Sequence, residues 1–437
     1  MNKGSTKLLV IVALIAVLCC SWYMLIDATT KENAEYEQQI TIAREKLSAG
    51  LYQVALEHFE QAKTMRDSIE LRDEMAEVYK TYGTPSNYES FCNQIKTDYP
   101  TEPVAYERLA SFYCENKEYD LFYNIKKSSE KRGVKSDKIE ELAKPLEYAY
   151  RLADVNAVEL GSSSVGYTMA LREKGFWGFL SDKGRTAVSF SYVTVSPFAN
   201  NVFYAETKNG DYGLFDSSEK MISRVTDERI IEDCTILNEG KMAVKYDGKY
   251  HYCNESFNEL FGAYDDASVF VGGVAAVKKE DKWSIIDEKG KEITGFIYEE
   301  IKLDDVDVAF RNGCAFAKKN GKYILIDQKG NQIGNATWED VDAFSNDMLA
   351  AVMNNGKWGF VDATGKEVVP CQYEKANSFY NGMAAVQINE KWGFISSSDF
   401  ELKIDAVFAE VRDFSKQGSV YVKEKDKWKL LQIYRLG

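Results

Sequence analysis

The stretch NNGKWGFVDATGKEVVP, residues 354–370, decides the fold of the C-terminal part of the chain because it occurs more than once. Related stretches are DKWSIIDEKGKEI from Asp281, GKYILIDQKGNQI from Gly321, EKWGFISSSDFEL from Glu390 and GFWGFLSDKG from Gly175. A catalytic centre is normally built once, whereas a structural unit can be built many times. The stretch is therefore interpreted as a repeated structural unit rather than as a single site.

The copies align on one aromatic residue, with steps of 35, 38, 33, 40, 35, 34 and 36 residues between successive copies. Each copy holds two β-prone runs around a turn that ends in Gly-Lys or Asp-Lys, a pattern that predicts a β-hairpin. A second signature follows some 15 residues later, as in Tyr298-EEI and Tyr373-EKA, and predicts a third strand. The aligned aromatic residues, which we expect to form the structural core of the repeats, are Trp177, Tyr212, Tyr250, Trp283, Tyr323, Trp358, Trp392 and Trp428.

Each recurrent residue type has a structural explanation. A tryptophan can join neighbouring units, the glycine after it lets another backbone approach, and an Asp-x-x-Gly ending favours an Asx turn with glycine at positive φ. A lysine also recurs before the aromatic residue and would form one rim if the repeats closed into a ring. We interpret these lysines first as solvated hairpin residues and second as a candidate binding rim: Lys249, Lys282, Lys322, Lys357, Lys391 and Lys427.

These motifs resemble the bacterial WG-repeat family, also called KWG repeats, from about Tyr167 to the C-terminus. The resemblance implies an all-β repeat fold with an interaction role and assigns no reaction. Four copies lack the glycine after the aromatic residue, so we expect uneven units: these copies carry His251, Ser284, Ile324 and Lys429 instead.

The two ends of the repeat region indicate how it is completed. The last copy stops without its downstream strand, while residues 155–167 supply β-prone residues before the first hairpin. One end can therefore complete the other, as in β-propellers. We expect a β-propeller-like ring of seven or eight small blades, with an open β-superhelix as the alternative.

Residues 31–155 show apolar residues at the helical spacing of three and four. Ala43, Ala76 and Ala110 recur at 33 and 34 residues, and the surrounding pattern resembles the tetratricopeptide repeat, a helix-turn-helix unit. A closing helix is expected from Lys138 to Val155. The resemblance implies a groove at nine positions: Glu37, Ile40, Arg44, Glu70, Asp73, Glu77, Lys80, Glu107 and Ser111. Because five of the nine are acids, such a groove would favour a basic or amine-bearing peptide, and a plain solvated helix face is the alternative.

The uncharged run Leu8–Ile26 is 19 residues long and comes close to spanning a bilayer. Lysines before it and acids after it predict a cytoplasmic N-terminus and an extracytoplasmic remainder. Cleavage, or lipidation at Cys19 or Cys20, is the alternative. The sequence thus predicts a single-pass anchor and flank over residues 1–30, helical repeats over 31–155 and a WG-repeat domain over 156–437.

The formal net charge of −14 disfavours a nucleic-acid partner. The chain has only 2 histidines, on unrelated segments, and its cysteines lack metal-ligand spacing and are expected to be free thiols. We therefore predict no enzyme, catalytic residue, metal or cofactor. The sequence favours a non-catalytic scaffold for a protein or peptide partner over a propeller that binds carbohydrate or a cell-envelope ligand. An enzyme with acids in a central channel is the third interpretation. The oligomeric state is left open.

Overall fold

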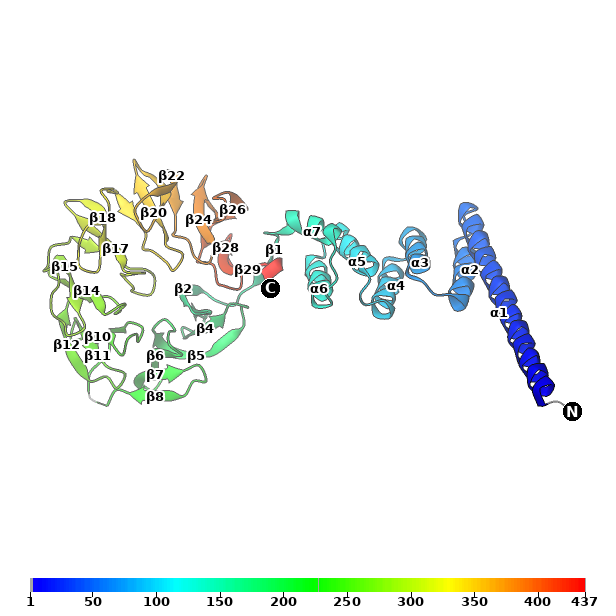
Figure 1. Cartoon of the computed structure of the whole chain (residues 1–437). Coiled ribbons are helices and arrows are strands. Elements are labelled where there is room, and N and C mark those ends of the chain that lie inside the picture. Colours follow the sequence, from blue (N-terminus) through cyan, green and yellow to red (C-terminus); the bar gives the residue numbers. More distant parts are fainter. Residues whose placement is uncertain (1–2, 227, 437) are drawn as a thin grey trace. The chain divides into compact units, whose positions relative to one another are not determined.

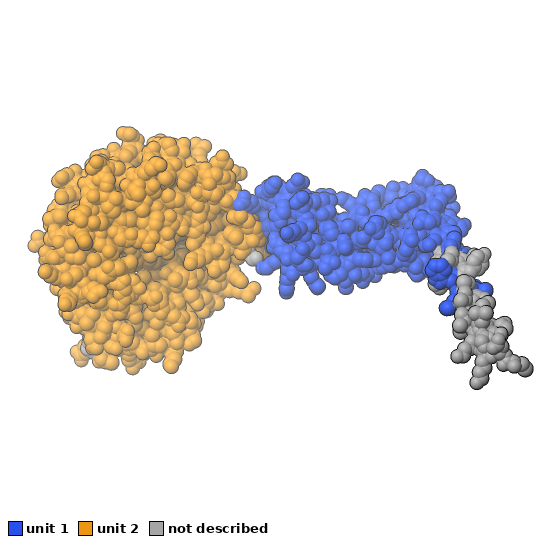
Figure 2. All heavy atoms as spheres, in the orientation of Figure 1, with its two compact units in different colours: residues 1–147 blue, residues 148–437 orange. Residues whose placement is uncertain are grey.

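The computed structural model describes residues 3–226 and 228–436, although only part of the side chains before residue 30. The chain divides into two units, residues 1–147 and residues 148–437 (Figure 2). The first is helical and the second consists of small antiparallel sheets (Figure 1).

The helical unit is built from pairs of consecutive helices joined by short turns. Buried alanines allow close helix approach, and Ala43, Ala76 and Ala110 are completely buried, as predicted. The third helix begins at a Ser68 cap, whose side chain accepts a hydrogen bond from the Leu71 amide. The paired helices are α1 (Lys3–Ser48) with α2 (Tyr52–Met65), α3 (Ile69–Tyr82) with α4 (Pro85–Asp98), and α5 (Pro103–Glu115) with α6 (Tyr119–Lys131).

The closing helix is shorter than predicted. It consists of α7 (Asp137–Ala143) and the 3-10 turn η1 (Lys144–Leu146), and the expectation of a helix up to Val155 is wrong. The following residues form strand β1 (Tyr150–Asp154), which pairs with the last strand of the chain. Tertiary pairing therefore overrides the local helical pattern, and the boundary between the units lies at residues 147/148 instead of 155/156.

The β unit contains the eight predicted repeats in chain order. The first two share one seven-stranded sheet because β5 is long enough to serve both. Its strands are β2 (Glu159–Ser164), β3 (Tyr167–Leu171), β4 (Trp177–Ser181), β5 (Thr186–Val195), β6 (Val202–Thr207), β7 (Tyr212–Asp216) and β8 (Met221–Arg224). The third repeat contains β9 (Asp233–Cys234), β10 (Met242–Tyr246), β11 (Lys249–Cys253) and β12 (Glu259–Tyr264).

The next four repeats form separate sheets of three or four strands. The fourth and fifth contain β13 (Asp266–Ala267), β14 (Val274–Lys279) and β15 (Lys282–Asp287), then β16 (Glu300–Ile301), β17 (Cys314–Lys319) and β18 (Lys322–Asp327). The sixth contains β19 (Asp340–Val341), β20 (Leu349–Asn354), β21 (Lys357–Asp362) and β22 (Glu367–Tyr373). The seventh contains β23 (Lys375–Ala376), β24 (Met383–Ile388), β25 (Lys391–Ser396) and β26 (Leu402–Phe408).

The eighth repeat closes the ring seen in Figure 1. Its strands β27 (Glu410–Val411), β28 (Ser419–Glu424) and β29 (Lys427–Ile433) are completed by β1, with Leu152 opposite Leu431. The Tyr421 hydroxyl also donates to the Ser181 carbonyl of the first repeat at 2.8 Å. The ends meet as predicted, but β1 completes the last repeat, whereas residues 155–167 supply β2 to the first.

The glycine after the repeat aromatic lets a fourth strand approach closely in the sixth and seventh repeats. A Cβ at Gly359 would lie 2.5 Å from the Val369 carbonyl oxygen of β22, and one at Gly393 would lie 2.6 Å from the Ile404 oxygen of β26. Both positions coincide with a register shift between the paired strands. Where Ser284 or Ile324 replaces the glycine, the fourth strand is reduced to isolated bridges. The repeats with His251 and Lys429 at this position keep a regular fourth strand, β12 and β1 respectively. The uneven units expected from the sequence are thus present.

The predicted anchor lies in α1. Within the described residues, no helix is long and apolar enough to cross a membrane. Most side chains of Leu8–Ile26 lie outside the described residues.

Candidate functional site

A hollow of about 270 Å³ lies on the helical unit, at the predicted groove. Five of the nine predicted groove positions line it, on α3 and α5: Asp73, Glu77, Lys80, Glu107 and Ser111. The structure adds four lining residues that the sequence did not single out: Tyr88, Val104, Arg108 and Lys138. Helices α3, α4, α5 and α7 therefore contribute to one site.

Arg108 changes the charge expected for this hollow. Its Nε donates to the Asp73 carboxylate, its Nη1 donates to Glu77 at 2.9 Å, and its Nη2 donates to the Asp73 carbonyl oxygen at 3.0 Å. These bonds keep the pKa of the guanidinium above its usual value against the opposing effect of burial. Together with Lys80 and Lys138, Arg108 balances the three acids in the lining, so the structure does not support the expected preference for a basic peptide.

Some of the other polar groups of the hollow already have hydrogen-bond or ion-pair partners. The Ser136 hydroxyl donates to Glu107 at 2.7 Å, and Lys80 pairs with Glu115 at 3.1 Å. Lys138 is exposed and has no ion-pair partner within residues 3–226 and 228–436. Lys138 is therefore the cation of the hollow most open to a ligand.

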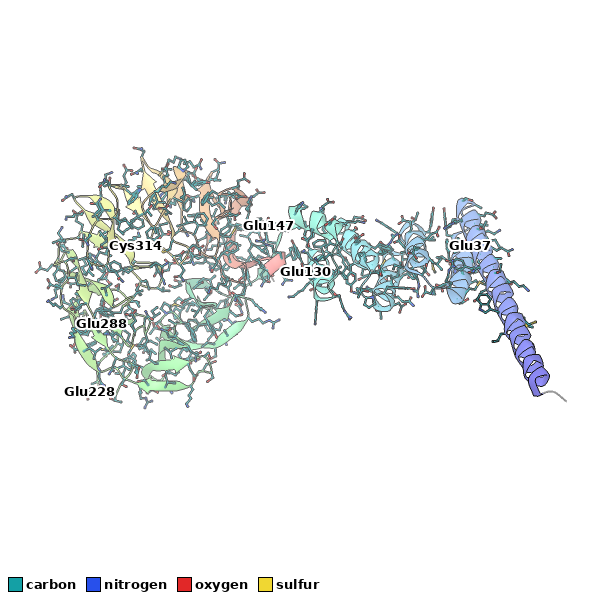
Figure 3. The ribbon with its side chains drawn as sticks, in the orientation of Figure 1. Glu37, Glu130, Glu147, Glu228, Glu288 and Cys314 are labelled. Atoms are coloured by element: carbon teal, nitrogen blue, oxygen red, sulfur yellow. The ribbon has the colours of Figure 1, made fainter. Side chains whose placement is uncertain are left out.

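The N-terminal half of the predicted groove does not join this hollow. Ile40 is 4% exposed and belongs to the helical core, which corrects its assignment as a groove residue. Arg44 pairs with Glu74 at 2.7 Å, and Glu37, which projects from α1 in Figure 3, pairs with Arg66 at 3.4 Å. Glu70 is exposed and lies outside the lining.

The repeat aromatics are structural, and they connect the two sequence signatures. Trp358 lies opposite Tyr373, and Trp392 lies opposite Phe408, across neighbouring strands. Such cross-strand aromatic pairs stabilise a sheet. Three of the eight aligned aromatics are buried, Trp283, Tyr323 and Trp428, and the other five are half-buried: Trp177, Tyr212, Tyr250, Trp358 and Trp392.

The recurrent lysines lie at equivalent turns. Each of the six is the first residue of the strand after the hairpin turn, and each is exposed: Lys249, Lys282, Lys322, Lys357, Lys391 and Lys427. Acids lie among them, because Lys249 pairs with Asp265, and Lys322 pairs with Glu339 at 3.4 Å. Glu339 also accepts a hydrogen bond from the Gly356 amide at 3.2 Å. The rim therefore alternates in charge and is not a purely cationic surface.

The centre of the ring is crossed by one loop, residues 302–308, which we name the crossing loop. It follows β16 in the fifth repeat, yet the Asp305 carbonyl oxygen accepts a hydrogen bond from the Ser162 hydroxyl of the first repeat at 2.5 Å. The Asp307 carbonyl oxygen accepts from the Val269 amide of the fourth repeat at 2.8 Å. The longest step in the sequence, 40 residues from Trp283 to Tyr323, marks this insertion, although its path could not be read from its length.

The crossing loop places acids near acids of other repeats. Burial raises the pKa of Asp307 to about 7, and repulsion from Asp233 and Asp266 adds to this effect. Burial likewise raises the pKa of Asp342 and of Asp413, each with a contribution from Asp305. The sequence had suggested central acids only within the enzyme interpretation, without naming them.

Neither a metal centre nor a disulfide is present in the part of the chain that the structure describes. The described cysteines are free thiols, and Cys92 and Cys234 are buried. Burial raises the pKa of the Cys92 thiol to about 11, so this side chain is an inert core residue rather than a nucleophile.

Comparison with known proteins identifies the β repeats. A family model described as "WG containing repeat" matches residues 252–283, 283–323, 325–358, 358–392 and 392–428. No curated protein sequence matches the chain significantly.

Solved structures that match the chain include three proteins of low identity. BamB from Moraxella catarrhalis is 9% identical, with a TM-score of 0.41 over 64% of this chain and 98% of that chain. Kluyveromyces lactis Hsv2p is 9% identical, with a TM-score of 0.38 over 58% and 97%. The Neurospora crassa Pan2 WD40 domain is 12% identical, with a TM-score of 0.31 over 56% and 89%. Through the five matches of the family model, residues 252–428 are identified as WG repeats.

Proposed function

We propose that this protein is a non-catalytic interaction scaffold whose helical unit binds a segment of a protein partner. The observation that carries the proposal is the hollow on α3, α4, α5 and α7. Its lining combines both charges with the apolar Val104 and the ring of Tyr88. A peptide segment that carries neighbouring acidic and basic side chains matches this lining better than a uniformly basic one.

The contacts around the hollow support a preformed site. Arg108 on α5 is bonded to Asp73 and Glu77 on α3, so the two helices that supply most of the lining are held together. Ser136, which caps α7, is bonded to Glu107 on α5. A partner therefore meets side chains that are already ordered, which reduces the entropy lost on binding.

Charge reversal at the open edge of the hollow tests this function. The full-length chain and its Lys80→Glu/Lys138→Glu variant would be crosslinked in native membranes, and the captured proteins compared. We expect the variant to lose its partner by about tenfold or more, because opposite charges become like charges at the contact. Lys131→Glu, on an exposed residue of α6 outside the lining, is the matched control and should leave capture unchanged.

Two results would count against the hollow as the partner site. One is capture of the same proteins by the Lys80→Glu/Lys138→Glu variant and by the parent. The other is partner binding that does not weaken between 0.1 M and 1 M salt, where the Debye length falls from about 10 Å to about 3 Å. Circular-dichroism melts of each variant check that the helical unit is intact.

We also propose that Leu8–Ile26 anchors the chain, with the N-terminus in the cytoplasm and the rest outside. The charge bias around this run supports that orientation. Protease added to intact cells, or to spheroplasts where an outer membrane intervenes, should digest the region after Asp27 and spare a short N-terminal fragment. Full protection of the chain would contradict this orientation.

The carbohydrate-binding alternative receives little support from the repeat aromatics. Sugar binding needs exposed aromatic faces, whereas these side chains are buried or half-buried, several of them in cross-strand pairs. A glycan array with the full-length chain tests this alternative directly.

A further inference from the structure

We propose that three sulfur atoms in the core of the third repeat bind one monovalent soft metal ion, of which copper(I) is the biological example. The ligands are the thiols of Cys234 and Cys253 and the thioether of Met242. This site lies in the β unit, so it is independent of the scaffold role proposed for the helical hollow.

Strand pairing brings the three sulfur residues to one face of the third sheet. Cys253 of β11 lies directly opposite Met242 of β10, and Cys234 of β9 lies opposite Val244, two residues further along β10. Side chains two residues apart on a strand point to the same face. All three belong to one buried cluster, which side chains of the second repeat complete, and they are 3% (Cys234), 1% (Met242) and 0% (Cys253) exposed.

The distance between two of the sulfurs suits two ligands of one ion. The Sγ of Cys234 and the Sδ of Met242 lie 3.7 Å apart. With metal–sulfur bonds of about 2.3 Å, this separation corresponds to an angle of about 107° at the ion, close to the tetrahedral angle. Cys253 is placed to supply the third donor, because residues opposite each other in an antiparallel ladder have Cβ atoms about 5 Å apart.

The kind of donor selects the kind of ion. Thiolate and thioether sulfurs are soft ligands that favour copper(I), whereas structural zinc sites use four donors from cysteine, histidine or carboxylate side chains. Among the described residues, no three histidine, cysteine, aspartate or glutamate side chains are placed to hold a metal, so this site depends on the thioether of Met242. Each cysteine that binds the ion releases its thiol proton to solvent, and no electron is transferred. Two thiolates and one monovalent ion leave a single negative charge.

The hydroxyl of Tyr204 supplies an independent observation at the same place. Tyr204, on β6 of the second repeat, belongs to the same buried cluster and is 2% exposed. Its hydroxyl oxygen is buried and has no hydrogen-bond partner within residues 3–226 and 228–436. Burial raises the pKa of this phenol, and Cys234 makes the next largest contribution.

A bound ion would give this hydroxyl a partner. An enclosed hydroxyl without a hydrogen bond costs free energy. Once Cys234 is a thiolate, the Tyr204 hydroxyl can donate to its negatively charged sulfur. Outer partners of this kind orient the ligands of a metal and raise its affinity. Tyr204 is therefore a positioning residue of the site, and the three sulfurs are its ligands.

Competition for copper(I) tests the site in the full-length chain, kept in mild detergent without oxygen. A chromogenic copper(I) chelator would set the free ion concentration, and native mass spectrometry would count the ions held by each chain. The buried sulfurs are reached through local opening, so the mixtures are equilibrated before measurement. We expect one tightly held ion per chain. A Cys19→Ser/Cys20→Ser background, used throughout, excludes ions held by the adjacent cysteines of the N-terminal run.

Single substitutions separate the ligands from the packing of the core. Cys234→Ala and Cys253→Ala should each weaken copper(I) binding by about a hundredfold or more, above the effect of losing an outer partner. Met242→Leu conserves volume, so it should fold like the parent and yet bind the ion more weakly by about tenfold or more. Tyr204→Phe should weaken binding by about tenfold. Its ion-free melt should be no lower than that of the parent, because the hydroxyl removed has no partner.

Cys92→Ala is the matched control, because Cys92 is a completely buried cysteine of the helical unit. It should hold the ion as the parent does, and circular-dichroism melts without copper show whether each variant is folded. The proposal is overturned if the chelator strips the parent as readily as Cys234→Ala, or if a folded Met242→Leu binds copper(I) as tightly as the parent. Equal losses from Cys92→Ala and Cys234→Ala would also contradict it, since binding would then not depend on the three sulfurs.

Discussion

At the scale of single residues, the glycine after the repeat aromatic has the clearest role. Gly359 allows the β22 backbone to approach β21 at a register shift, and a methyl group there would meet the Val369 carbonyl oxygen. The sequence already indicated that the glycine makes room for a backbone. It could not indicate that the fourth strand is nearly lost in the repeats with Ser284 and Ile324, because that depends on pairing between strands.

Gly359→Ala tests this role. We expect it to lower the free energy of unfolding of the β unit by about 1–3 kcal/mol, the usual cost of overpacking. Ser284→Ala, at the equivalent position of a repeat without a regular fourth strand, should cost about 1 kcal/mol or less, since no added group meets the backbone. Denaturant melts compare the two variants, and similar losses from both would contradict the close-approach explanation.

The repeat aromatics allow a second prediction at this scale. Trp428 is 4% exposed and packs in the core shared by the last and first repeats, so Trp428→Ala should cost about 3–5 kcal/mol. Trp358→Ala should cost less, because Trp358 is half-buried. Lys427→Ala, next to Trp428 but exposed, should change stability by less than about 0.5 kcal/mol. Equally small effects from all three variants would indicate exposed aromatics that bind a ligand.

At the scale of elements, the helices and hairpins could be predicted from the spacing of apolar residues and of the repeats. The contacts that one element makes with another could not. The groove positions on α3 and α5 were predictable because helical periodicity places them on one face. Arg108, one residue beyond a predicted position, was missed, because its bonds to Asp73 and Glu77 depend on how α5 packs against α3. In the same way, the 40-residue step from Trp283 to Tyr323 contains the crossing loop, but no loop was predicted from it, because only the closed ring determines where its acids lie.

The crossing loop predicts a pH dependence. The pKa of Asp307 is raised to about 7 in the folded state, so between about pH 4 and pH 7 the folded state binds more protons than the unfolded state. The contribution of Asp307 to the free energy of unfolding is therefore fully present below about pH 4, and it is lost as the pH rises through 7. Asp305, Asp342 and Asp413 act in the same direction, because their pKa values are also raised.

Asp307→Asn isolates this contribution. Asn tolerates the positive φ of 62° at this position, so the loop conformation is kept. We expect the melting temperature of the parent to fall between pH 5 and pH 8, and that of the variant to fall less. At pH 8 the variant should be more stable, on the order of 1 kcal/mol, since one pKa unit is about 1.4 kcal/mol and the side chain is partly hydrated. Parallel pH profiles would show that Asp307 is not the titrating group.

At the scale of the whole molecule, sequence reasoning anticipated a helical region followed by a ring of β repeats, and it misplaced the junction between them. Residues 150–154 continue an apolar helical pattern, so local periodicity assigned them to the preceding helix. In the structure they form β1, and Leu152 packs with Tyr150 against the core of the last two repeats. Only the unpaired edge of the last repeat, far away in the sequence, makes this strand necessary.

Two fragments of the β unit test the role of β1 in closing the ring. A fragment of residues 148–437 keeps β1, whereas one of residues 155–437 leaves the edge of β29 without its partner and exposes part of the core near Leu431. An unpaired edge strand promotes association with other chains. We therefore expect the shorter fragment to melt at a lower temperature and to elute as aggregates in size-exclusion chromatography, while the longer one stays monodisperse. A version of the shorter fragment with a seven-residue Gly/Ser extension controls for length and should behave like the shorter fragment. If all three melted at the same temperature, the eighth repeat would not need β1, and the junction predicted at residue 155 would describe the independent unit better than the observed one at residue 147.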